Sequence, residues 1–80
     1  MDCESCARAV AAEILDRLST LRQPLPTSFL LKELEARTDC RVQTIGMAFP
    51  QIEKILAANG LKAEKLGTPV RISISRRNSS

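Results

Sequence analysis

The chain is 80 residues long, which is enough for one small domain and too short for two. Its hydrophobic residues (44%) and charged residues (26%) are as frequent as in ordinary globular domains, and no apolar run approaches the roughly 20 residues of a membrane span. The sequence contains no histidine, which excludes His-dependent catalysis, and only two phenylalanines are available for stacking on bases. The composition therefore disfavours an enzyme.

The charge is divided unevenly along the chain. Residues 1–40 carry five basic and seven acidic side chains, whereas residues 41–80 carry seven basic and two acidic ones. A polyanion, if one binds, would therefore meet the C-terminal half. A solvated surface with a basic tail is the simpler interpretation, and charge alone does not separate the two.

The first periodic segment predicts an amphipathic helix from about Ser5 to Leu21. Asp2 and Glu4 favour its start, because negative charge is stabilised at a helix N-terminus. Prolines 24 and 26 end it, since a residue before proline is pushed out of the α region. Its apolar residues recur at spacings of three and four: Ala7, Val10, Ala11, Ile14, Leu18 and Leu21.

A second, short helix is predicted to begin at Thr27 or Ser28 as N-cap and to end near Arg37. Its first N–H groups would be available to a phosphate. The buried face would consist of Phe29, Leu30, Leu31 and Leu34, and the solvated face of Lys32, Glu33, Glu35 and Arg37.

A third helix is predicted from about Thr44 to Ala58, with Asn59-Gly60 as a C-terminal cap in the left-handed region. In a regular helix the ring of Pro50 would clash with the carbonyl of Gly46, four residues earlier. The helix is therefore either irregular between these two residues or has its first turn at Pro50. We prefer the first of these alternatives.

The last segment changes to the period of a β-strand. Residues 61–66 and 70–75 flank a Gly67-Thr68-Pro69 turn and predict a β-hairpin, and residues 76–80 would form a flexible basic tail. The predicted core is Val10, Ile14, Leu18, Leu30, Leu34, Ile45, Phe49, Ile52, Leu56, Leu66, Val70 and Ile72.

This order of elements over residues 7–75 resembles a winged helix-turn-helix domain. The stretch 44–61, TIGMAFPQIEKILAANGL, resembles the recognition-helix segment of that superfamily, with Asn59-Gly60-Leu61 leading into the first wing strand. The chain is similar to compact winged-helix modules of phage- and plasmid-type regulatory or replication proteins. The resemblance implies one α+β domain over residues 1–80, with three helices and a C-terminal β-hairpin wing.

It also implies which residues would contact duplex DNA. The third helix would enter a major groove, and the hairpin and tail would contact phosphates or the minor groove. The recognition-helix residues are Arg41, Gln43, Thr44, Met47, Gln51 and Lys54, and the wing and tail residues are Lys62, Lys65, Arg71, Arg76 and Arg77. Gln43 and Gln51 suit adenine edges, and Met47 or Ala48 suits a thymine methyl, a set compatible with base reading but not rich in it.

The cysteines form a C-x-x-C at Cys3 and Cys6, with Cys40 as the third thiol. A structural zinc site needs four thiolate or imidazole ligands, so a carboxylate or a second chain would have to complete one. The surroundings of a thioredoxin-like redox motif are missing. We expect reduced thiols that are dispensable for folding, no metal, no cofactor and a cytoplasmic location.

The sequence therefore predicts a small DNA-binding protein without catalytic residues, acting as a transcriptional or replication regulator. One such module offers a small interface, so a homodimer is expected, with helix one and its Ala7, Val10, Ala11 and Ile14 face as the contact. The alternative is a protein-interaction module, an adaptor or an inhibitor of a nucleic-acid enzyme. The modest basicity of the third helix and the acidity of the first half favour that alternative.

Overall fold

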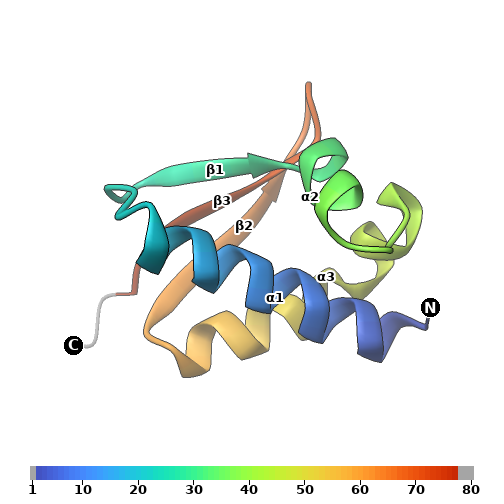
Figure 1. Ribbon diagram of the computed structural model, residues 1–80, viewed down its shortest axis with the longest axis horizontal. Coiled ribbons are helices and arrows are strands. Elements are labelled where there is room, and N and C mark those ends of the chain that lie inside the picture. Colours follow the sequence, from blue (N-terminus) through green and yellow to red (C-terminus); the bar gives the residue numbers. More distant parts are fainter. Residues whose placement is uncertain (1, 78–80) are drawn as a thin grey trace.

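The computed structural model describes residues 2–77, with one strand between the first two helices and two strands after the third helix. The described elements are α1 (Cys3–Thr20), β1 (Thr27–Leu30), α2 (Leu31–Arg37), α3 (Val42–Ala58), β2 (Leu61–Leu66) and β3 (Arg71–Arg76) (Figure 1). Three helices and a three-stranded antiparallel sheet confirm the predicted α+β class.

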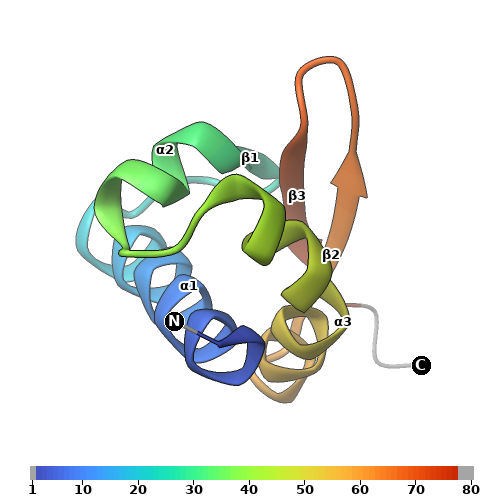
Figure 2. The same ribbon diagram turned by 90° about the vertical axis from the view of Figure 1, so that its right-hand side faces the viewer.

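The strands follow the order β1-β3-β2, so β3 is the central strand and pairs with both neighbours. Ile72 of β3 lies opposite Phe29 on one side and Lys65 on the other. Helices α1 and α3 lie side by side below the sheet, and the tip of the β2–β3 hairpin projects beyond the helices (Figures 1 and 2). The hairpin tip is therefore exposed to solvent, whereas β2 lies beside α3.

The core lies between α1, α3 and the inner face of the sheet. Its largest fully buried side chains are Val10, Ile14, Phe29, Leu31, Leu34, Ile45, Ile52, Leu56, Ile72 and Ile74. The predicted core members Leu18, Leu30 and Phe49 are only half-buried. Leu66 and Val70 were predicted wrongly, because they are 37% and 45% exposed. Side chains alternate along β2, so Leu66 points away from the face that buries Ala63.

Residues 27–30 form a strand, which corrects the prediction that a helix starts there. Phe29 is buried opposite Ile72, and the flanking Ser28 is exposed, as in a half-buried strand. Helix α2 begins only at Leu31 and has no side-chain N-cap. The Thr27-Ser28 pair therefore neither caps a helix nor offers helix-end N–H groups to a phosphate.

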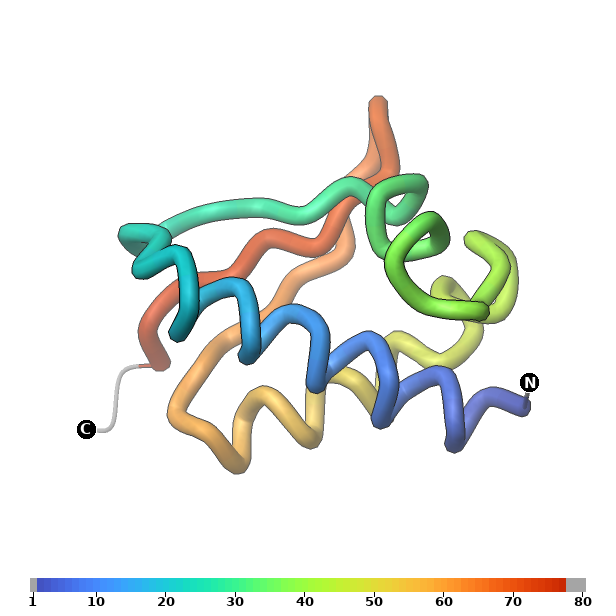
Figure 3. Tube along the Cα trace, viewed as in Figure 1, coloured from blue at the N-terminus to red at the C-terminus, as the bar shows by residue number. Residues whose placement is uncertain are grey.

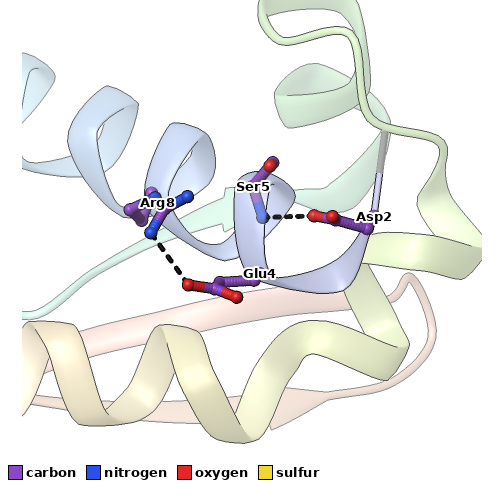
Figure 4. Close-up of polar contacts among 4 residues, drawn as sticks. All are labelled: Asp2, Glu4, Ser5 and Arg8. Carbon is purple, nitrogen blue, oxygen red and sulfur yellow. Dashed lines mark hydrogen bonds and ion pairs between the residues drawn. The ribbon is translucent and has the colours of Figure 1, made fainter.

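Helix α1 begins two residues earlier than predicted because Asp2 is its N-cap. The backbone N–H of Ser5 donates to Asp2 Oδ1 at 2.8 Å, and Arg8 Nη1 donates to Glu4 Oε1 at 3.0 Å one turn on (Figure 4). The hydrogen bond from Ser5 lowers the pKa of the Asp2 carboxyl below its ordinary value. Ionised Asp2 therefore stabilises the fold at neutral pH.

This stabilisation should be lost as the pH falls through the lowered pKa of Asp2, because the folded state binds that proton less readily than the unfolded state. Asp2→Asn keeps a capping oxygen but does not titrate. We expect the difference in Tm between wild type and Asp2→Asn to move in favour of the variant as pH is lowered from about 7 to about 2. Thermal unfolding followed by circular dichroism measures it, and a difference independent of pH would contradict the capping role.

A disulfide joins Cys6 to Cys40, which contradicts the expectation that these two thiols are reduced. The two residues are 34 positions apart, their Cα atoms are 5.7 Å apart and both are fully buried. The bond ties the first turns of α1 to the segment just before α3. The prediction of a cytoplasmic location rested on reduced thiols, and this disulfide removes that reason for it. Cys3 is the free cysteine among residues 2–77, and no group of three metal-ligating residues occurs in that range.

Candidate nucleic-acid interface

The exposed face of α3 brings together four predicted residues. Gln43, Met47, Gln51 and Lys54 follow one another at spacings of four, four and three, which places them on one side of a helix. All four are exposed, and Met47 is 72% exposed. Ala48, the other residue predicted for a thymine methyl, is buried in the core, which corrects that prediction. The opposite side of the helix buries its apolar residues in the core, so this polar stripe is directed outward.

The remaining two predicted helix residues lie at the start of α3, which begins at Val42 and not at Thr44. Arg41 is the exposed N-cap residue, and Thr44 is half-buried. The Val42 N–H donates to Glu35 Oε2 of α2 at 2.9 Å. Glu35 was assigned to the solvated face of its helix; instead it caps α3 and supplies negative charge at its N-terminus. No local sequence signal indicated this, because the two residues belong to different helices.

Pro50 lies inside α3, and the helix continues through it from Val42 to Ala58. The predicted irregularity does not break the helix. Asn59 and Gly60 end it as predicted, with Gly60 at a φ of 77° in the left-handed region. The chain then turns into β2, which runs back alongside α3 (Figure 3).

The cations of the hairpin are engaged with other groups of the chain. Lys62 Nζ lies 3.3 Å from Glu64 Oε1, an exposed ion pair within β2. Arg71 Nη1 donates to the carbonyls of Gly67 and Pro69 at 2.8 and 3.1 Å. Arg71 therefore braces the hairpin turn, and Lys62 is the more available of the two for a ligand, because exposed ion pairs are weak.

An open hollow of about 380 Å³ lies between α3 and β2, where residues of both predicted groups meet. Lys54 of α3, Lys62 of β2 and Arg77, which follows β3, line it together. Its other lining residues are Glu53, Ala57, Leu61 and Ala63. The Arg77 N–H donates to the Gly60 carbonyl at 3.1 Å, so the backbone that carries this arginine is fixed. Three cations thus surround a space open to solvent.

The predicted tail begins one residue too early, because Arg76 belongs to β3. Arg76 is the last residue of β3 and pairs with Leu61, and its side chain lines a different hollow beside the end of α1. The structure therefore separates Arg76 from Lys54, Lys62 and Arg77. Residues 78–80 of the predicted tail lie outside the described residues.

The face of α1 that was expected to supply dimer contacts is inside the domain. Ala7, Val10, Ala11 and Ile14 are each at most 1% exposed and pack in the core. They are unavailable to a second chain, so any dimer must use another surface.

Comparisons of the chain with protein-family models, curated proteins and solved structures find no match. Within residues 2–77, no helix has both the length and the apolarity needed to cross a bilayer. The chemistry of the interface is therefore judged from its own geometry: a polar helix face, an adjoining cationic hollow and a projecting hairpin.

Proposed function

We propose that the chain is a small non-enzymatic DNA-binding protein with a winged helix-turn-helix fold, acting as a regulator of transcription or replication. The element order α1-β1-α2-α3-β2-β3 supports this fold. A short connection joins α2 to α3, and the β2–β3 hairpin stands beside α3 in the place of a wing. In this fold α3 is the recognition helix.

The observation that carries the proposal is the position of the cationic hollow directly beside the exposed face of α3. With α3 in a major groove, Gln43, Met47 and Gln51 would face base edges. Lys54 and Lys62, together with Arg77, would then neutralise phosphates of the flanking backbone. Cations from α3, from β2 and from the residue after β3 line this one opening, an arrangement that suits a polyanion.

Salt dependence tests the proposal. Fluorescence anisotropy on a labelled duplex should show an affinity that falls steeply as salt is raised. The triple variant Lys54→Gln, Lys62→Gln and Arg77→Gln should reduce the slope of log K against log salt by about 2–3, since each lost phosphate contact contributes about 0.9. Arg8→Gln is the matched control on α1, because it removes an exposed positive charge outside the interface. Wild type that does not bind at about 50 mM salt would contradict DNA binding.

Gln51 separates base reading from phosphate attraction. After selection of a preferred duplex from a random pool, Gln51→Ala should weaken binding to it by about 1–3 kcal/mol. Binding to an unrelated duplex should change little. An equal loss on both duplexes would remove Gln51 from the base-reading set.

A second candidate function is a protein-interaction module, and an apolar hollow of about 380 Å³ favours it. This hollow lies where the hairpin meets α2 and α3, and its lining is Leu30, Leu31, Lys32, Val42, Pro69 and Val70. Val70→Glu would place a charge in it without touching the cationic hollow. Loss of a partner in pull-downs at ordinary ionic strength, with DNA affinity intact, would support this function.

A further inference from the structure

Pro50 leaves one carbonyl of α3 without its helical donor. A proline has no N–H, so the carbonyl four residues earlier, on Gly46, receives no bond from position 50. A backbone acceptor in the middle of a helix needs water or a side chain in that place. Gly46 is half-buried at the side of α3 that adjoins β2.

Lys65 of β2 supplies the donor that Pro50 lacks. Its Nζ donates to the Gly46 carbonyl oxygen at 3.5 Å. Alternation along β2 places Lys65 on the same face as buried Ala63, so its side chain extends toward the helices. A Cβ at position 46 would lie 3.9 Å from this nitrogen, an ordinary van der Waals separation, so the contact does not depend on glycine at this position.

The contact spans the two elements that the proposed function assigns to DNA. Residues of β2 also form one wall of the cationic hollow, and Lys65 lies further along the same strand, toward the hairpin tip. Fixing Lys65 on α3 therefore fixes the direction in which the hairpin leaves the helix.

We propose that Lys65 is a positioning residue that sets the hairpin against α3, and that Pro50 creates its acceptor. Lys65 was predicted from the sequence to contact phosphate; here it acts through α3 instead. The consequence for DNA rests on the proposed function, whereas the contact itself does not.

A double-mutant cycle in the free protein tests the contact. Lys65→Met should lower Tm by about 2–5 °C in the Pro50 background, because the Gly46 carbonyl loses its donor. In the Pro50→Ala background the alanine N–H supplies that donor, so Lys65→Met should lower Tm little. Lys65→Arg, which keeps a donor, should restore wild-type Tm. Lys62→Met is the control and should behave alike in both backgrounds. An equal loss for Lys65→Met in both backgrounds would overturn the proposal.

Binding to duplex DNA supplies the second measurement. Lys65→Met should weaken binding by a similar factor at every salt concentration and leave the salt slope unchanged, whereas Lys62→Met should reduce the slope by about 0.9. A similar reduction for Lys65→Met would make Lys65 a phosphate contact and overturn its positioning role. If wild type does not bind DNA, the proposed function fails, and the thermal cycle alone decides whether Lys65 holds the hairpin on α3.

Discussion

Phe29→Ala is expected to lower the free energy of unfolding by about 3–5 kcal/mol, comparable to the whole stability of a marginal domain. Phe29 is 1% exposed and lies opposite Ile72 in the sheet. Its ring also lies under the Arg17 guanidinium, 5.3 Å from the ring centroid. The substitution therefore leaves a cavity between the sheet and α1 and removes the surface on which Arg17 packs.

Urea denaturation of wild type and variant measures this loss. Phe49→Ala is the matched control, because the same atoms are removed from a half-buried side chain on α3. It should cost about 1–2 kcal/mol, since less apolar surface leaves water on folding. Similar midpoints for Phe29→Ala and wild type would show that β1 does not pack as described.

Local periodicity was sufficient to predict α1, α3 and the hairpin. Apolar residues three and four apart place Val10 and Ile14, or Ile45 and Ile52, on one buried face whatever surrounds the helix. Residues 61–66 form β2 as predicted, because the hairpin closes through a short turn and needs no distant partner.

The prediction failed where the outcome depends on distant residues. Thr27 and Ser28 are good N-caps by themselves, yet pairing of Phe29 with Ile72 turns this segment into a strand. The Cys6–Cys40 bond likewise requires the first turns of α1 to meet the segment before α3, which spacing alone does not reveal.

The candidate interface was likewise predictable only in part. Exposure of Gln43, Met47 and Gln51 follows from helix geometry and was predictable. The contacts of Glu35 and Lys65 with α3 were not, because they join separate elements. Pro50 was a usable signal for the second contact, since a proline beyond the first turn of a helix leaves the carbonyl four residues earlier without its helical donor.

The disulfide gives the other large expected effect. Reducing Cys6–Cys40, or replacing both residues with alanine, should lower the free energy of unfolding by about 3–4 kcal/mol, because a cross-link across a 34-residue separation restricts the unfolded chain. The alanine variant also loses two buried side chains, so reduction of the wild type is the cleaner measurement.

Thermal unfolding with and without a phosphine reductant, alongside thiol counting by mass spectrometry, tests the bond. Cys3→Ser is the control: it leaves the bond intact, so its Tm should drop on reduction as much as that of wild type. Oxidised wild type should carry one reactive thiol after unfolding, and Cys3→Ser should carry none. Three thiols in wild type purified without reductant, or a Tm unchanged by reduction, would contradict the bond.

Because Cys40 lies two residues before Val42, reduction should also loosen the start of α3. If the chain binds DNA as proposed, reduced protein should bind it more weakly while the salt slope stays the same, since no phosphate contact is lost.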